Sequence, residues 1–367
     1  MPLALYRKYR PTTFDDLIGQ DIIVRILKEA ARQDRIAHAY LLSGPRGTGK
    51  TSTARLIAKI ANCKKREEDK EFKKKAEPCN ICDACKAIDT NSALDVIEID
   101  AASNRGIDEM RSLKEHVRVA PSTLKNKVFI IDEAHMLTKE AANALLKTLE
   151  EPPEYVIIIL ATTEIEKIPA TIGSRTQKFR FRHVPLQKIA GKLEKIAQTE
   201  KIKISKEALE LIASQAEGSF RDAESLLDQM TAIAGSEITV EEIENTLGTI
   251  GFKKVAELAG ALLESDLDRA ITLLHDIQDE GHNIVGLTKD LITYLRRVAI
   301  MKHTPQIKEK LAQELMQDHL TQIETHAALF TDKHLTLLKS LIVAYGQMRY
   351  SDFPIIPLEI AVIENTK

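Results

Sequence analysis

Gly44-Pro45-Arg46-Gly47-Thr48-Gly49-Lys50-Thr51 is the stretch of this chain that decides its fold. It fits G-x-x-x-x-G-K-[ST], the pattern of the phosphate-binding P-loop. Apolar residues 39–42 before it predict a buried strand, and the apolar spacing over residues 52–61 after it predicts a helix. Because the pattern requires strand, glycine loop and helix in this order, we prefer a nucleotide site to a glycine-rich turn without a ligand.

The P-loop residues indicate how a nucleoside triphosphate is held. Glycines let successive backbone N–H groups turn toward phosphate oxygens, and the following helix adds its positive N-terminal dipole. We expect the Lys50 ammonium to reach the β- and γ-phosphates and the Thr51 hydroxyl to hold Mg²⁺. The rest of the predicted phosphate loop is Gly44, Pro45, Arg46, Gly47, Thr48 and Gly49.

A second apolar run, residues 128–131, ends in two acids. Ligands of α/β folds bind at the carboxyl ends of strands, so we expect Asp132 to hold the Mg²⁺ shell and Glu133 to activate the attacking water. Thr163 follows the apolar run 156–160, and we expect it between the P-loop and these acids, near the γ-phosphate. Each feature alone also fits an ordinary surface loop, but beside a P-loop they favour nucleotide hydrolysis.

The chain has four cysteines, and they are closely spaced: Cys63, Cys79, Cys82 and Cys85. C-x-x-C-x-x-C with one further thiol upstream is typical of a tetrahedral zinc site with four cysteine ligands. Such a site has no open coordination position, so we expect structural zinc and no catalysis. An iron–sulfur cluster and free thiols are the alternatives.

Composition excludes several classes of protein. With 367 residues, 44% hydrophobic and 29% charged, the chain is long enough for two or three ordinary domains. The net charge of -2 gives no global basic field, and 4% aromatic residues without tryptophan argue against base stacking as the main binding mode. No apolar run approaches the ~20 residues of a membrane-spanning helix. We therefore expect a cytoplasmic protein with no membrane partner and with reduced cysteines.

Apolar runs divide the chain into a mixed part and a helical part. Strand-like runs at 96–99, 128–131 and 156–160 alternate with helical patterns at 108–119 and 139–150. This alternation predicts a parallel sheet covered on both faces. Further expected segments are a helix over 22–32, a solvated charged excursion over 64–77 and a last strand over 177–181. After Pro185 only helical patterns follow, first at 188–200, 205–215 and 219–234, and then to the end of the chain.

Two arginines outside the P-loop are candidates for phosphate contacts. Arg221 lies in the first turn of a predicted helix, where the helix dipole disfavours a cation, so a phosphate partner is indicated. Arg175 lies just before the last predicted strand. An arginine there is usually a surface residue; the functional alternative is a finger that reaches the γ-phosphate of a neighbouring subunit.

Besides the P-loop and the cysteines, five further segments belong to one pattern. They are Tyr6-Arg7-Lys8-Tyr9-Arg10-Pro11, Ile18-Gly19-Gln20, Ile130-Ile131-Asp132-Glu133-Ala134-His135-Met136-Leu137, Leu145-Leu146-Lys147-Thr148-Leu149-Glu150-Glu151-Pro152-Pro153 and Gly218-Ser219-Phe220-Arg221-Asp222-Ala223. Together they resemble one family, the gamma/tau subunits of the bacterial DNA polymerase III clamp loader, which are AAA+ ATPases. The resemblance is dense from residue 1 to about residue 234 and only architectural beyond it.

The resemblance implies a AAA+ nucleotide-binding domain over residues 1–183, with a zinc-binding insertion at about 63–85. A helical lid domain over 184–241 and a helical collar, or oligomerisation, domain over 242–367 would follow. It also implies a ring-like pentamer with other clamp-loader subunits, within a DNA-directed DNA polymerase holoenzyme, a nucleotidyltransferase complex. ATP and Mg²⁺ would drive opening of the sliding clamp and its loading onto primer–template DNA, with zinc as a structural cofactor.

The resemblance also implies roles for single residues. Thr163 matches the first sensor of the family, Arg221 the second sensor, and Arg175 the finger that acts in trans. Thr176 stands where the family usually has cysteine, but the preceding arginine is kept. The implied adenine pocket is lined by Arg7, Tyr9 and Pro11, and the implied contacts to DNA phosphates, which carry no sequence preference, come from Arg105 and Arg111.

Two other functions fit parts of this pattern. One is a different AAA+ ATPase of DNA replication or recombination, such as a helicase loader or a branch-migration motor. The cysteine module and the lack of an additional DNA-binding domain in the sequence argue against it. The other is a non-hydrolysing scaffold subunit of the clamp loader. The presence of Lys50, Thr51, Asp132 and Glu133 argues against that.

Overall fold

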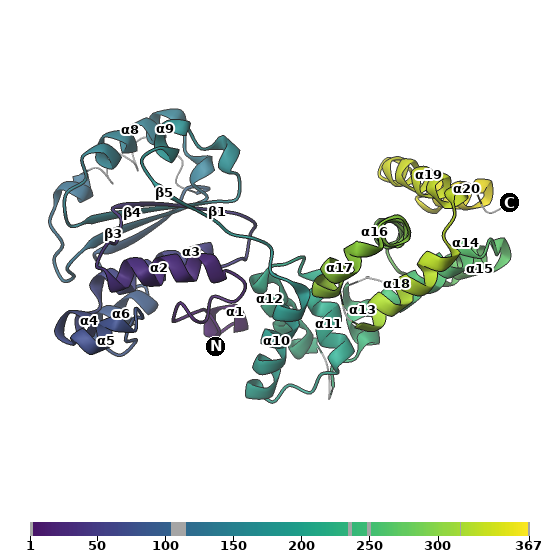
Figure 1. Cartoon of the computed structure of the whole chain (residues 1–367), viewed down its shortest axis with the longest axis horizontal. Coiled ribbons are helices and arrows are strands. Elements are labelled where there is room, and N and C mark those ends of the chain that lie inside the picture. Colours follow the sequence, from purple (N-terminus) through teal and green to yellow (C-terminus); the bar gives the residue numbers. More distant parts are fainter. Residues whose placement is uncertain (1–2, 104–114, 234–236, 248–250, 316, 366–367) are drawn as a thin grey trace. The chain divides into compact units, whose positions relative to one another are not determined.

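The computed structural model of the chain describes residues 3–103, 115–233, 237–247, 251–315 and 317–365. The chain divides into two compact units, and each has its own hydrophobic core. The first unit consists of Met1–Val184 with Ala216–Ser225, and the second of Pro185–Gln215 with Leu226–Lys367. Figure 1 shows the sheet of the first unit and the helices of the second.

The first unit is built on a parallel sheet of five strands in the order β2-β3-β4-β1-β5. Every residue of β1 and β4 is buried, as expected for apolar strands covered on both faces. Because β4 lies between β1 and β3, the ends of all three strands meet at one edge of the sheet. The strands are β1 Ala39–Ser43, β2 Val96–Asp100, β3 Lys127–Asp132, β4 Val156–Thr162 and β5 Gln177–Arg180.

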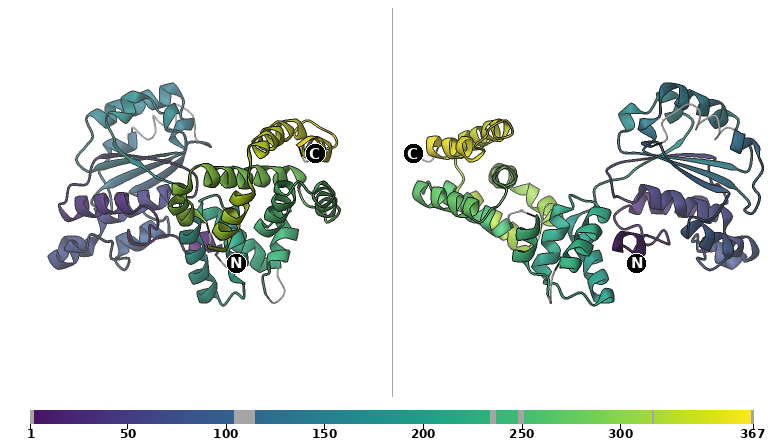
Figure 2. Two further views of the ribbon diagram at one scale, coloured as in Figure 1. Left: turned by 45° about the vertical axis from the view of Figure 1, so that its right-hand side comes forward. Right: turned by 180° about the vertical axis from the view of Figure 1, so that it is seen from behind.

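Helices cover both faces of this sheet (Figures 1 and 2). Alternate residues of β1 show the two layers, because Tyr40 belongs to the hydrophobic cluster under α2 and α3, whereas Leu41 belongs to the cluster under α8. The elements of this unit other than strands are α1 Leu5–Lys8, α2 Asp21–Arg32, α3 Lys50–Asn62, α4 Lys64–Glu68, α5 Lys70–Lys74, α6 Asp83–Asp89, η1 Ala134–Met136, α8 Lys139–Glu150, η2 Ile165–Lys167 and α9 Ala170–Gly173.

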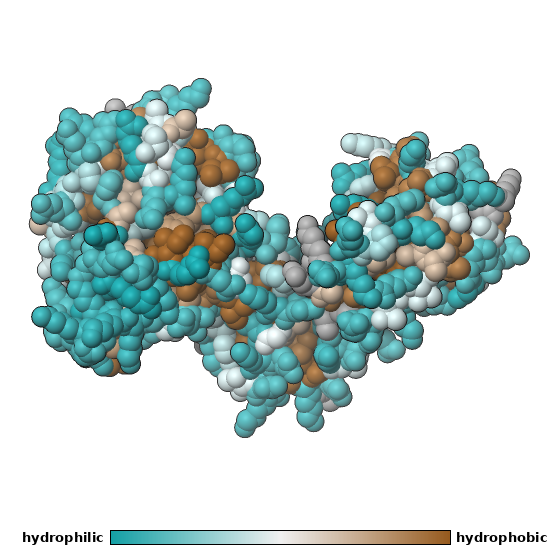
Figure 3. Space-filling view, in the orientation of Figure 1, coloured by the Kyte–Doolittle hydropathy of each residue, from teal (hydrophilic) through white to brown (hydrophobic). Residues whose placement is uncertain are grey.

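The charged stretch 64–77 is mostly exposed, as expected, and its outer surface is almost wholly hydrophilic (Figure 3). It is nevertheless folded, into α4 and α5. One residue that attaches it is Arg66, which is only 5% exposed. Its guanidinium donates to the backbone oxygens of Ile60 and Ala31, each at 2.7 Å, near the carboxyl ends of α3 and α2. A cation is favourable at those helix ends, so Arg66 is one of the contacts that attach the stretch to the core.

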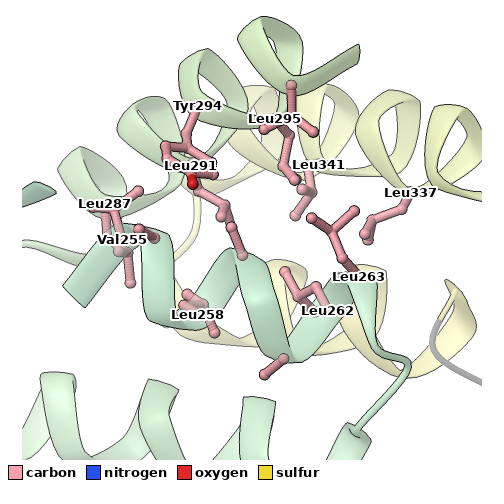
Figure 4. Close-up of a cluster of buried hydrophobic side chains, with 14 of the residues drawn as sticks. Val255, Leu258, Leu262, Leu263, Leu287, Leu291, Tyr294, Leu295, Leu337 and Leu341 are labelled. Carbon is pink, nitrogen blue, oxygen red and sulfur yellow. The ribbon is translucent and has the colours of Figure 1, made fainter. Parts of the chain in front are cut away.

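The described part of the second unit is helical except for one bridge between Ile204 and Ile238. Its largest core packs leucines of α14, α16 and α19 against one another, among them Leu258, Leu291 and Leu341 (Figure 4). Helix α12 begins in the first unit and ends in the second. The helices from residue 186 onward are α10 Leu186–Glu200, α11 Lys206–Gln215, α12 Phe220–Ile233, α13 Val240–Leu247, α14 Phe252–Leu263, α15 Leu267–Asp279, α16 Ile284–His303, η3 Pro305–Ile307, α17 Lys308–Glu314, α18 Gln317–Leu329, α19 Asp332–Met348 and α20 Ile355–Asn365.

The predicted fold class is therefore confirmed: a P-loop α/β core with a parallel sheet is followed by helical segments. The predicted helix over 139–150 has the bounds of α8. Most of the predicted helix over 108–119 lies outside the described residues.

Candidate functional site

The P-loop joins β1 to α3 at the carboxyl edge of the sheet. Gly44, Gly47 and Gly49 have φ of 142°, 69° and 103°, the region in which glycine is favoured. A Cβ atom on Gly44 would lie 2.5 Å from the backbone oxygen of Phe181, directly after β5, so a side chain at Gly44 would displace that segment. Both conditions require glycine in the loop.

Lys50 begins α3 and is only 6% exposed. Its ammonium donates to the backbone oxygens of Gly44, at 2.9 Å, and Pro45, at 2.8 Å. Burial lowers the pKa of Lys50, and the nearby carboxylates of Glu133 and Asp132 oppose that shift. A buried cation in a loop of turned N–H groups fits an anionic polyphosphate.

Thr51 and Asp132 meet beneath the loop. The Thr51 hydroxyl donates to Oδ2 of Asp132 at 2.7 Å, and Oδ1 of Asp132 accepts from the backbone N–H of Glu133 at 2.9 Å. A hydroxyl and a carboxylate oxygen in contact are hard ligands of the kind that Mg²⁺ takes beside substrate phosphates. This pair therefore fits the predicted magnesium site.

Glu133 has a left-handed backbone, with φ of 48°. Its carboxylate is held from β4: the Thr163 hydroxyl donates to Oε2 at 3.1 Å. Non-glycine residues in this region of φ carry strain that the surrounding structure must compensate, and such residues cluster at functional sites. The structure thus brings Lys50, Thr51, Asp132, Glu133 and Thr163 to one edge of the sheet, as their order in the sequence predicted.

A histidine with no predicted role completes this cluster. Nδ1 of His135 lies 3.4 Å from Oε2 of Glu133 and 3.1 Å from the Thr162 hydroxyl, and its Nε2 lies 3.2 Å from Oε1 of Glu164. His135 therefore links Glu133 to a second acid on the β4 side. The sequence shows only that His135 follows the acidic pair and that Thr162 ends an apolar run; the sheet order brings the two together.

Arg221 lies beside the P-loop within the first unit. The backbone N–H of Phe220 donates to the oxygen of Gly47 at 3.1 Å, so the start of α12 touches the loop. The guanidinium of Arg221 lies 5.1 Å from the centre of the Tyr6 ring. Arg7 is next to it, because its Nε donates to the Tyr6 hydroxyl at 3.1 Å. Two cations near the P-loop are suitable for an anionic ligand.

The predicted adenine-pocket residues lie on the same N-terminal segment. Arg7 is exposed, whereas Tyr9 and Pro11 are half-buried. Arg10, between them, has a pKa lowered first by burial and then by the guanidinium of Arg55, while Glu98 opposes the shift. The segment therefore adds positive charge to this side of the unit, and no described contact assigns a base to it.

Arg175 follows α9, and its contacts are on the side of α8. Its guanidinium forms an ion pair of 2.6 Å with Glu150 at the end of α8 and donates to the backbone oxygen of Thr171 at 2.8 Å. The side chain remains 35% exposed. It is therefore accessible to a neighbouring molecule.

The four cysteines form one cluster, as predicted. All four Sγ atoms lie within 4.8 Å of one another, and those of Cys79 and Cys85 are 4.0 Å apart. Zinc–sulfur bonds of ~2.3 Å in a tetrahedron require sulfur atoms about 3.8 Å apart, so small adjustments would complete a zinc site. Backbone N–H groups already donate to sulfur, from Cys79 to Cys63 at 3.4 Å and from Cys82 to Cys79 at 3.3 Å. The donor set fits structural zinc.

Arg105 and Arg111, predicted to contact DNA, lie outside the described residues. Within the described ranges, no helix combines the length and the apolar character needed to cross a membrane.

Comparison with known proteins extends over almost the whole chain. Three family models match consecutive parts: "DNA polymerase III, delta subunit" over 19–185, "DNA polymerase III clamp loader subunit, ATPase lid domain" over 188–237, and "DNA polymerase III subunits gamma and tau domain III" over 238–366. Among solved structures, the RuvB branch-migration motor of Thermotoga maritima superposes with a TM-score of 0.47 at 19% identity, over 70% of this chain and 80% of that chain. That likeness is too distant to carry a functional argument.

Curated relatives are much more similar. DNA polymerase III subunit tau of Bacillus subtilis is 41% identical over 364 residues, which are 98% of this chain and 62% of the relative. Subunit gamma/tau of Mycoplasma pneumoniae is 43% identical over 83% of this chain and 45% of the relative. Subunit tau of Escherichia coli is 40% identical over 82% of this chain and 46% of the relative. The chain thus spans between 45% and 62% of the length of these relatives.

Proposed function

Because the chain belongs to the gamma/tau family of DNA polymerase III clamp loader subunits, we propose that it is an ATPase motor subunit of the bacterial replicative clamp loader. ATP binding and hydrolysis would drive opening of the sliding clamp and its loading onto primer–template DNA. The observation that carries the proposal is the contact of Thr51 with Asp132 beside the P-loop, with Glu133 held next to them by Thr163. This arrangement combines phosphate binding with activation of water.

Each residue of the cluster has a role in the proposed hydrolysis. Lys50 would exchange its two backbone acceptors for β- and γ-phosphate oxygens. Thr51 and Asp132 would hold Mg²⁺, which when bound bridges phosphate oxygens and neutralises their charge. The Glu133 carboxylate would orient the attacking water and accept its proton. Thr163, which donates to that carboxylate at 3.1 Å, would donate to the γ-phosphate or to the water once nucleotide is bound.

The two arginines would complete the site from outside the sheet. Arg221 would sense the nucleotide from the start of α12, close to the P-loop. Arg175 would leave Glu150 and reach the γ-phosphate of a neighbouring subunit, which places half of each active site on another chain. ATPase activity of the isolated subunit should therefore be weak.

The further assignments follow the family. We propose a nucleotide-binding domain at 1–183 with a structural zinc insertion at 63–85, a lid at 184–241 and a collar at 242–367, assembled into a ring-like pentamer with other clamp-loader subunits. The ring would grip the sliding clamp and follow the DNA backbone, with Arg105 and Arg111 as phosphate contacts and Arg7, Tyr9 and Pro11 around the adenine. It would work in the cytoplasm, as a subunit of a DNA-directed DNA polymerase holoenzyme.

The decisive experiment measures ATP hydrolysis with and without primed DNA, sliding clamp and the partner subunits. We expect weak hydrolysis by the subunit alone and strong stimulation when all three are present. Lys50→Ala should lose nucleotide binding and clamp loading together. Normal clamp loading by Lys50→Ala would contradict the motor role and favour a scaffold subunit.

A further inference from the structure

The N-terminal lead-in, residues 3–20, packs beside the P-loop. Phe14 and Leu17 are buried in the hydrophobic cluster that also contains residues of β1 and α3. A Leu17 methyl carbon lies 3.4 Å from where a Cβ atom on Gly49 would stand, so the lead-in is in contact with the loop. At its other end Tyr6 lies under the guanidinium of Arg221. The position of the lead-in therefore shapes one side of the nucleotide site.

One carboxylate from elsewhere in the chain holds the middle of the lead-in. Glu77 accepts the backbone N–H of Phe14 at 2.7 Å and that of Asp15 at 3.2 Å. Lys28 joins the same group, with its ammonium 2.7 Å from Glu77 and 2.6 Å from Asp15. The Glu77 side chain is only 14% exposed. Charge-assisted hydrogen bonds away from bulk water are the strong ones, so this carboxylate is a firm attachment point.

Glu77 belongs to the insertion that the cysteines organise. It lies two residues before Cys79, and Ala76 before it is fully buried in a left-handed turn, with φ of 56°. Nearer the start of the insertion, Arg66 of α4 fixes it to the ends of α2 and α3. The path of the backbone through Glu77 is thus determined between two fixed points, Arg66 and the cysteine cluster.

We propose that Glu77 is a positioning residue through which the cysteine-held insertion fixes the lead-in against the P-loop. Loss of the metal or loss of the carboxylate would then detach the lead-in from the P-loop and weaken nucleotide binding. The inference rests on the proposed function only in so far as the P-loop binds ATP. In this proposal the insertion supports the nucleotide site indirectly, because none of its own residues belongs to that site.

The first test compares variants of the full chain in titrations with a fluorescent ATP analogue. Glu77→Ala should weaken nucleotide affinity by about tenfold while keeping its zinc, because a charge-assisted attachment is lost. Glu77→Gln, which keeps one acceptor oxygen but replaces the other by an amide NH2 group and removes the charge, should lose less than Glu77→Ala. Glu71→Ala is the matched control: this glutamate lies in the same insertion, is 80% exposed and pairs with Lys74. It should bind nucleotide like the wild type.

The second test asks whether the metal and the carboxylate act along one route. Removal of zinc by a chelator should weaken nucleotide affinity of the wild type but add little in Glu77→Ala, since the lead-in is already released. Hydrogen exchange at the amides of Phe14 and Asp15 should be faster in the zinc-free wild type and in Glu77→Ala than in the zinc-loaded wild type. This measurement does not depend on nucleotide.

Two results would overturn the inference. One is a folded, zinc-loaded Glu77→Ala variant with wild-type nucleotide affinity. The other is an equal loss of affinity on zinc removal in the wild type and in Glu77→Ala. A wild-type chain that bound no nucleotide would instead refute the proposed function, and the role of Glu77 with it. Failure of the Glu77 proposal alone can therefore be distinguished from failure of the proposed function.

Discussion

The Thr163 hydroxyl donates a hydrogen bond of 3.1 Å to Oε2 of Glu133, across the ends of two neighbouring strands. A hydroxyl has a single proton to donate, so Thr163 can hold the carboxylate or a phosphate oxygen, but not both at once. Nucleotide binding would therefore compete with Glu133 for this donor. Such competition would link occupancy of the site to the orientation of the Glu133 carboxylate.

Thr163→Val removes this donor with little change of shape. We expect nucleotide affinity close to that of the wild type, because the P-loop is intact, and a fall in the rate of hydrolysis of about 10²-fold, the usual effect of losing one positioned donor. Single-turnover hydrolysis in the assembled complex measures the rate, and titration measures affinity. Thr199→Val, on the exposed surface of α10, is the control. A wild-type rate in Thr163→Val would remove the sensor role.

The pair of Arg175 and Glu150 leads to a second prediction. Both side chains are partly exposed, so the pair contributes at most about 1 kcal/mol and can be exchanged for a phosphate contact. Arg175→Ala should leave nucleotide affinity nearly intact but abolish hydrolysis when the subunit is assembled with its partner subunits. Glu150→Gln frees the arginine without removing it and should hydrolyse normally. Unchanged hydrolysis by Arg175→Ala would refute the proposed role of Arg175 in a neighbouring site.

Metal content gives a third prediction. Freshly purified reduced protein should contain one zinc per chain, and Cys82→Ser should lose it because three thiolates bind far more weakly than four. Metal binding to such a site is also folding free energy, so the variant should unfold at a lower temperature. Elemental analysis and thermal unfolding check the two effects. Absence of metal from the wild type would contradict the site, and iron in place of zinc would favour the cluster alternative.

Much of the first unit could be predicted because its pattern is local. The strands are continuous apolar runs, and the P-loop glycines and Asp132 lie directly at their ends. Parallel topology then places these ends at one edge. The order of residues was therefore enough to bring Lys50, Asp132 and Thr163 together.

The contacts that could not be predicted join segments far apart in the chain. Nothing near Arg66 distinguishes it from the lysines around it; only the fold shows that two helix ends meet its guanidinium. Glu77 looks like one more acid in a charged stretch, yet it holds Phe14, 63 residues away. His135 likewise acquires partners from β4 only through the sheet order. In each case partners come from tertiary packing, which periodicity does not encode.

The last prediction concerns Asp95, which is 1% exposed and holds the turn before β3. Its carboxylate accepts backbone N–H groups of Ser122, Thr123 and Leu124 at 2.9, 2.7 and 2.9 Å. Burial alone would raise its pKa, but these hydrogen bonds outweigh burial and lower the pKa to about 2. The lowered pKa means that the folded state favours the ionised form, so stability is gained above the unfolded-state pKa near 3.8.

Asp95→Asn should therefore be less stable than the wild type by about 2 kcal/mol at neutral pH. The difference should shrink as the pH falls from about 4 to about 2, because the wild-type carboxylate becomes protonated over that range. Urea unfolding of both proteins at several pH values measures it, with Asp352→Asn, an exposed acid, as the control. A difference that stayed constant down to about pH 2 would mean that shape, and not the charge of Asp95, holds the turn.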